Sequence, residues 1–115
     1  MRGSRRVGKS QPFSFMYYLY ILYSENSDKY YVGQTNNISR RLFEHNNSRR
    51  NSYTSKHRPW KIVATFELGN DRGYARKVEF KVKGLKSRDI IFDLVKHSGD
   101  ISYFAQMVRV PTCRD

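Results

Sequence analysis

Two β-type runs separated by a short polar turn limit the fold of this chain more than any other feature. The runs YYLYILYS at 17–24 and YYVGQT at 30–35 are rich in aromatic and branched residues. ENSDK at 25–29 has the composition of a turn, so the two runs predict an antiparallel hairpin. Because side chains alternate along a strand, the first run presents two different faces. One face carries Tyr18, Tyr20 and Leu22, and the other carries Leu19, Ile21 and Tyr23.

The rest of the chain predicts one further strand and three helices. They are expected over 38–46 (helix), 60–68 (strand), 74–86 (helix) and 88–97 (helix). Asn37 and Ser87 are suitable N-caps for the first and last of these helices. The middle helix follows from apolar residues at helical spacing, namely Ala75, Val78, Val82 and Leu85. The predicted fold class is therefore α+β, a small three-stranded antiparallel sheet flanked by helices in the order ββαβαα.

Both ends of the chain are expected to lie outside the folded domain, which we place at residues 16–97. Residues 1–15 are basic, rich in Gly and Ser and without apolar periodicity, so we expect a disordered leader or tag before a natural start at Met16. Residues 98–115 show no clear periodicity and are expected to form a tail. No apolar run approaches the roughly 20 residues that span a bilayer. The single cysteine, Cys113, forms no internal disulfide, which suits a cytoplasmic protein.

The charge balance is strongly basic. The chain has 115 residues, with 22 Lys and Arg against 10 Asp and Glu, giving a net charge of +12. Only four of the basic residues lie in the first fifteen positions. Such a surplus points to a polyanionic partner, with nucleic acid ahead of an anionic membrane surface. Solubility through excess lysine is the simpler alternative.

One carboxylate stands beside the apolar stripe of the helix predicted over 74–86. Glu79 lies four residues after Ala75 and three before Val82. A carboxylate in that position needs a cation, a metal ion or a raised pKa. An ion pair with Lys83, four residues on, is the commoner arrangement and remains open. The single cysteine and three scattered histidines have no zinc-binding spacing.

Three further residues in the first half of the chain are candidates for a site. Arg41 and His45 are four residues apart on one helix face. The planar guanidinium suits a phosphate, whereas a solvated arginine and a surface histidine are the commoner cases. Gly33 weakens the strand in which it lies, so we expect a bulge or the close approach of another backbone there.

Taken in order, these residues resemble the motifs of the GIY-YIG nuclease superfamily, most closely its small standalone bacterial members. Tyr18-Leu19-Tyr20 stands where the family has G-I-Y, and Tyr31-Val32-Gly33 stands where it has Y-I-G. Arg41 matches the family's helix arginine, His45 a position that is often histidine or tyrosine, and Glu79 the metal-binding glutamate. The resemblance covers about residues 16–95.

The sequence departs from the family pattern at three places, one of which is the asparagine that closes the motif set in several members and has no clear counterpart here. Tyr18 replaces the glycine of G-I-Y, a change that leaves Tyr20 in position. Some members use a further histidine after the first helix, where this chain offers Tyr53, Thr54 and His57.

The resemblance implies hydrolysis of DNA phosphodiester bonds with one divalent metal ion, Mg²⁺ or Mn²⁺. Glu79 would bind the metal, and Arg41 would bind the non-bridging phosphate oxygens. Tyr20 and Tyr31 would position and deprotonate the attacking water. That role requires a phenol pKa lowered from about 10, which we expect from Arg41 and the metal. His45 would act as a proton shuttle or a phosphate donor.

Nucleic-acid binding is expected from basic residues around this site, which would contact phosphates without reading the base sequence. These are Arg40, Arg49, Arg50, Lys56, Arg58, Arg76 and Lys83. The expected substrate is DNA, with RNA as the alternative, and cleavage would be structure-selective or weakly sequence-specific. No membrane partner is expected, and the chain would be a monomer or a weak dimer. Two non-enzymatic alternatives remain, a catalytically silent DNA-binding module and a ribosome-associated RNA binder.

Overall fold

The predicted hairpin forms the centre and one edge of a three-stranded sheet. The computed structural model describes residues 16–47 and 56–108. Strands β2 (Tyr17–Ser24) and β3 (Lys29–Thr35) pair antiparallel from Tyr18 opposite Thr35 to Ser24 opposite Lys29. Strand β4 (Lys61–Gly69) pairs antiparallel with the other side of β2. The strand order is therefore β3-β2-β4, with β2 in the middle.

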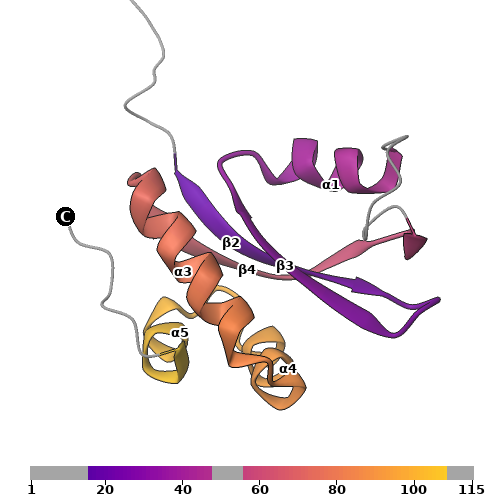
Figure 1. Ribbon diagram of the computed structural model, residues 1–115. Helices are drawn as coiled ribbons and strands as arrows, with labels where there is room; N and C mark the ends of the chain where they lie inside the picture. Colours follow the sequence, from indigo (N-terminus) through magenta and orange to yellow (C-terminus); the bar gives the residue numbers. More distant parts are fainter. Residues whose placement is uncertain (1–15, 48–55, 109–115) are drawn as a thin grey trace, which may run out of the picture.

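The two faces of the sheet bury two separate cores (Figure 1). Leu19 and Ile21 of β2 belong to the larger core, which also contains residues of the helices after β4. Tyr20 and Leu22 belong to a smaller core with Trp60, on the face covered by the helix between β3 and β4. The alternation predicted for 17–24 is confirmed, because neighbouring residues of β2 lie in different cores.

Polar side chains cap the helices at the predicted places. Helix α1 (Ile38–Asn47) follows Asn37, whose Oδ1 accepts a hydrogen bond from the Arg40 amide at 3.0 Å. Helix α4 (Arg88–Lys96) follows Ser87, whose Oγ accepts from the Ile90 amide at 3.3 Å.

Helix α3 (Arg72–Leu85) begins two residues before the predicted start, because Asp71 accepts hydrogen bonds from two amides of its first turn. It ends at Lys86, which has a left-handed backbone conformation. Ala75, Val78 and Val82 are buried against the sheet, as their spacing predicts. No helix in the described ranges has the combination of length and apolar composition needed to cross a bilayer.

A fourth helix, α5 (Ile101–Val108), lies where we predicted only a tail. Its residues Phe104 and Val108 belong to the larger core, and the Phe104 ring centroid lies 4.7 Å from that of Phe66 on β4. The Gly99 amide also donates to the Thr65 carbonyl at 2.9 Å, which fixes the start of this segment on β4. The prediction of no regular element in 98–115 is wrong for α5. A helix of eight residues is too short for its apolar periodicity to be recognised in the sequence, and α5 is stabilised by its contact with the sheet.

Candidate active site

A polar hollow of about 440 Å³ lies where strand β3 meets the helices α1 and α3. Four predicted catalytic residues line it, each from a different element: Tyr20 (β2), Tyr31 (β3), Arg41 (α1) and Glu79 (α3). These positions lie up to 59 residues apart in the sequence, and the fold brings them to one place. The rest of the lining is formed by Tyr17, Gly33, Gln34, Thr35, Asn36, Arg40 and Arg72.

The innermost part of the site is a buried pair between Tyr20 and His45. The Tyr20 hydroxyl oxygen lies 3.0 Å from His45 Nε2, and both residues are at most 5% exposed. The surface position considered for His45 is therefore wrong. His45 is absent from the lining of the hollow and contacts the site through Tyr20. The sequence did not predict this burial, because the face of α1 that turns inward depends on where the sheet lies.

Burial shifts the pKa values of both partners away from neutral pH. It raises the pKa of Tyr20 to about 12, although the Arg41 guanidinium beside the hydroxyl acts in the opposite direction. It lowers the pKa of His45 to about 4, and the positive charges of Arg41 and Lys83 act in the same direction. Arg41 does act to lower the Tyr20 pKa, as expected, but desolvation by burial outweighs the guanidinium. At neutral pH the pair is a phenol and a neutral imidazole.

Gly33 makes room for the Tyr20 ring. The register between β2 and β3 runs without interruption through Tyr20 opposite Gly33, so the predicted bulge is wrong. The close neighbour is a side chain and not another backbone. A Cβ atom on residue 33 would lie 2.4 Å from the Tyr20 hydroxyl oxygen and 2.5 Å from its Cζ. Only glycine at this position leaves the tyrosine in its place.

Tyr31 lies between the buried pair and the rim of the hollow. Its ring centroid is 4.9 Å from that of His45 in an edge-on arrangement and 6.4 Å from that of Tyr20. The ammonium nitrogen of Lys83 lies 5.1 Å from the Tyr31 ring centroid. This tyrosine is half-buried, so its hydroxyl is better placed than that of Tyr20 to meet a solvent molecule.

Arg41 and Glu79 supply opposite charges to the same hollow. Arg41 Nη1 donates to Glu44 Oε1 at 2.7 Å, and the arginine side chain is 35% exposed. Glu79 Oε2 lies 2.9 Å from Lys83 Nζ, so the simple ion pair considered for Glu79 does form. The carboxylate also lines the hollow, which means that the pair and a role in the site are compatible.

The lining of the hollow fits a weakly held divalent cation of the magnesium type. Within the described ranges there is no group of three or more His, Cys, Asp or Glu side chains that would form a metal cage. Mg²⁺ typically takes one or two protein oxygens and keeps several waters. Glu79 of α3 supplies a carboxylate, and Gln34 of β3 also lines the hollow. Gln34 Oε1 is buried and accepts no hydrogen bond in the part of the chain that the structure describes. An acceptor left without a donor is suited to a cation or its bound water.

Of the seven predicted nucleic-acid-binding residues, two lie at this hollow. Arg40 lines it, and Lys83 reaches it through the ion pair with Glu79. Lys56, Arg58 and Arg76 are exposed elsewhere on the surface. Arg49 and Arg50 lie outside the described residues, as do Tyr53 and Thr54. His57 is not part of the hollow, and its Nδ1 lies 2.9 Å from Ser27 Oγ.

Sequence reasoning missed four residues that also line the hollow, namely Tyr17, Gln34, Thr35 and Asn36. Tyr17 begins β2, and the other three lie at the end of β3 and in the turn that leads to α1. Thr35 is tied to that turn, because its Oγ1 accepts a hydrogen bond from the Asn37 amide at 3.1 Å. The position of Gln34, Thr35 and Asn36 directly before the Asn37 N-cap was the only signal in the sequence, and it indicates structure more than chemistry.

Comparison with known proteins agrees with this geometry. The model of the GIY-YIG catalytic domain matches residues 16–90, which is more than half of the chain. The chain belongs to the GIY-YIG family. The matched part of this GIY-YIG protein contains all of Tyr20, Tyr31, Arg41, His45 and Glu79, so the residues singled out from the sequence lie within the domain. The resemblance and the α+β fold predicted from it are both confirmed.

A relative of this GIY-YIG protein is the UPF0213 protein lwe0147 of Listeria welshimeri serovar 6b. The two are 39% identical over 66 residues, which cover 56% of this chain and 72% of the relative. Membership of the family gives the chain a domain of the nuclease type.

Proposed function

We propose that this protein is an endonuclease that hydrolyses DNA phosphodiester bonds with the help of one Mg²⁺ or Mn²⁺ ion. The observation that carries the proposal is the meeting of Tyr20, Tyr31, Arg41 and Glu79 in one polar hollow. A protein that only binds DNA needs cations there and has no use for a carboxylate. The chain has a net charge of +12, which supports a polyanionic substrate.

Arg41 is proposed to bind the non-bridging oxygens of the scissile phosphate. Glu44 occupies one of its N–H groups, and the guanidinium has five, so donors remain for a phosphate. Negative charge on these oxygens grows as water attacks, and a donor already in place stabilises it. Loss of one such donor costs roughly 3 kcal/mol in comparable sites.

Tyr31 is proposed to take the proton from the attacking water, and Tyr20 to be a positioning residue. Tyr31 acts in this step as a phenolate: the water oxygen forms a bond to phosphorus, the water proton passes to the Tyr31 oxygen, and the bond to the leaving oxygen breaks, with that oxygen taking a proton from solvent. The ammonium nitrogen of Lys83 lies 5.1 Å from the Tyr31 ring centroid, so a positive charge stands beside this tyrosine. Tyr20 is poorly suited to this step, since burial raises its pKa to about 12. It holds its place through His45 and through the space left by Gly33.

The metal would be held by Glu79, with the Gln34 amide oxygen as a second ligand or as the acceptor of a metal-bound water. When bound, the ion supplies Lewis-acid stabilisation of the phosphate and of the leaving oxygen. Lys83 stays close enough to Glu79 to hold the carboxylate in position at 2.9 Å.

The test is cleavage of labelled single-stranded, duplex and branched DNA in Mg²⁺, in Mn²⁺ and in EDTA. Wild type is compared with Glu79→Gln, and Glu67→Gln serves as the matched control because Glu67 is exposed on β4 away from the hollow. Both substitutions remove one negative charge, so any general effect on DNA affinity is the same. We expect metal-dependent cleavage that falls by more than about 100-fold in Glu79→Gln only.

Two results would overturn the proposal. Binding of DNA without cleavage of any substrate would favour the catalytically silent module. Preference for RNA with no effect of metal would favour the RNA binder. Cleavage that persists unchanged in Glu79→Gln would show that the metal site is assigned to the wrong residue.

A further inference from the structure

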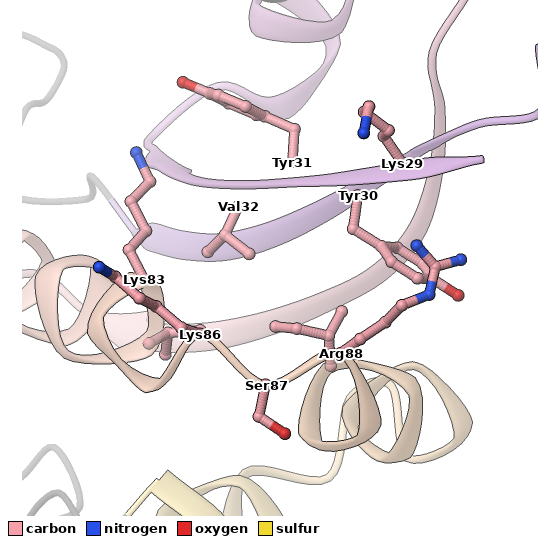
Figure 2. A pocket seen from close by; sticks show the side chains of 10 residues that line it. Lys29, Tyr30, Tyr31, Val32, Lys83, Lys86, Ser87 and Arg88 are labelled. Atoms are coloured by element: carbon pink, nitrogen blue, oxygen red, sulfur yellow. The ribbon is translucent and has the colours of Figure 1, made fainter. Parts of the chain in front are cut away.

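A second hollow lies on the other side of Tyr31, between the edge strand β3 and the junction of α3 with α4. It has a volume of about 380 Å³ (Figure 2). We call it the β3–α4 groove. It is lined by Lys29, Tyr30, Tyr31, Val32, Val82, Lys83, Lys86, Ser87, Arg88 and Ile91.

The charge of the β3–α4 groove is one-sided. Four of its lining residues are cations, and no carboxylate is among the ten lining residues that the structure describes. Two of the cations have partners, since Lys83 pairs with Glu79 and Arg88 pairs with Asp28 at 2.6 Å. Lys29 and Lys86 are exposed. Two lysines at a concave surface favour an anionic ligand.

Lys86 has a backbone conformation that lysine rarely adopts. Its φ of 50° and ψ of 37° place it in the left-handed region, at the C-cap of α3 where glycine is the usual residue. A side chain there costs stability relative to glycine. Strain of this kind is commonly found at functional positions. The lysine side chain lines the groove, which gives a reason for its presence.

The floor of the groove is apolar and aromatic. Val32 and Val82 are buried in the larger core, and Ile91 packs against it. Tyr30 adds a ring, with the Arg88 guanidinium carbon 5.1 Å from its centroid. Cations around an apolar and aromatic surface are the combination by which proteins bind single-stranded nucleic acid, with phosphates on the cations and bases on the rings.

The groove is continuous with the candidate active site. Tyr31 lines both hollows, and Lys83 lines the groove while it pairs with Glu79 of the site. A strand whose phosphate lies at Arg41 therefore has a path past Tyr31 into the groove.

We propose that the β3–α4 groove binds an unpaired nucleotide of DNA next to the scissile phosphate. Its phosphate contacts Lys86, a neighbouring phosphate contacts Lys29 on the other face of the edge strand β3, and its base lies against Tyr30 and the apolar floor. The volume is within the range of pockets that hold one small ligand, roughly 300–1,000 Å³, and it does not admit a duplex. In a duplex the bases are stacked and paired, so the floor would gain no contact. The inference rests on the proposed function for its choice of ligand, and it makes DNA with a single-stranded segment the preferred substrate.

Binding in EDTA tests the groove without requiring cleavage. The probes are a labelled single-stranded oligonucleotide, a blunt duplex and a duplex with a single-stranded overhang. The variant is the double substitution Lys29→Ala, Lys86→Gly. The control is Lys81→Ala, Lys96→Ala, which removes the same two charges from exposed positions outside both hollows. Glycine at position 86 suits the left-handed backbone, so the melting temperature should be unchanged or higher, and a loss of binding cannot be due to unfolding.

We expect the groove variant to lose at least about tenfold in affinity for the single strand and the overhang duplex. For the blunt duplex it should lose no more than the control pair does. The proposed role of the groove would be overturned if the groove variant lost equal affinity for all three probes, or if the two double variants lost equal affinity. Either result would mean that the lysines act only through their general charge.

Cleavage assays in Mg²⁺ separate this inference from the proposed function. If the wild type binds the overhang duplex through the groove and cuts no probe, the proposed nuclease activity is wrong and the proposed role of the groove stands. If the wild type cuts blunt and overhang duplexes equally well and the groove variant is equally active, the proposed nuclease activity stands and the proposed role of the groove is wrong.

Discussion

The Tyr20 hydroxyl oxygen lies 3.0 Å from Nε2 of His45, which joins the central strand to helix α1 beneath the candidate active site. Both residues are buried, and each has its pKa shifted away from neutral pH by that burial. The family's tyrosine and histidine therefore act here as one neutral hydrogen-bonded unit. Under the proposed function, the task of this pair is to hold the site, and proton transfer belongs to the less buried Tyr31.

Tyr20→Phe should lower the cleavage rate and leave its pH dependence unchanged. The ring keeps its place in the smaller core, but the buried His45 Nε2 loses its partner, so stability should fall by about 1–3 kcal/mol. With a pKa of about 12, the hydroxyl does not ionise between pH 7 and 9. The measurement is the rate of cleavage across that range for wild type and variant. If the rate of the wild type rose tenfold per pH unit and that rise vanished in Tyr20→Phe, Tyr20 would be the base after all.

The burial of His45 should make the folded protein less stable in mild acid. The pKa of His45 is about 4 in the folded state and 6.5 ordinarily, so between these values only the unfolded chain binds the proton. Stability should therefore fall as the pH is lowered from about 6.5 to about 4, by an amount on the order of 2 kcal/mol. Urea unfolding at pH 7 and pH 4.5 measures this fall. His45→Gln, whose starting stability differs, should show a smaller fall, and an equal fall in both proteins would contradict the prediction.

Gly33→Ala should destabilise the protein although alanine is a small residue. The added methyl group would lie 2.4 Å from the Tyr20 hydroxyl oxygen, so the ring or the strand has to move. Overpacking of this kind costs about 1–3 kcal/mol. Gly84→Ala is the matched control, because nothing lies within 4 Å of the new methyl group on α3. That change should stabilise the protein by up to about 1 kcal/mol, and urea unfolding of the two variants should give opposite signs.

Phe104→Ala should show that α5 is part of the folded domain. The Phe104 side chain is completely buried and packs on Phe66 of β4. Its loss should cost about 3–5 kcal/mol of unfolding free energy. Ser102→Ala on the exposed side of the same helix should change stability by less than about 0.5 kcal/mol. Similar stability of the two variants would indicate that α5 contributes little to the core.

The elements that the sequence predicts well are those with local causes. The β2–β3 hairpin follows from its aromatic runs and polar turn, and the starts of α1 and α4 follow from the capping side chains of Asn37 and Ser87. Helix α5 was missed because its eight residues depend on contact with β4. A periodic stripe of that length has little weight without a partner surface.

The candidate site likewise has features that the sequence predicts and features that it does not. Tyr20, Tyr31, Arg41 and Glu79 could be named in advance from their order and spacing, because the family pattern fixes their chemistry. The burial of His45 and the fit of Tyr20 against Gly33 could not, since both depend on how α1 and β3 meet β2 in space. The acceptor oxygen of Gln34 was missed for the same reason.

The position of β2 between two cores affects which residues would change in related chains that had lost nuclease activity. Tyr20 belongs to the smaller core and also lines the hollow, whereas Arg41 and Glu79 belong to no core and form partly exposed ion pairs, so their exchange should cost the fold less. A related chain that had lost nuclease activity would therefore keep its tyrosines for reasons of packing. If the proposed function holds, the tyrosine motifs alone would make such a chain look active, and the arginine and the glutamate would be the positions that distinguish active from inactive relatives.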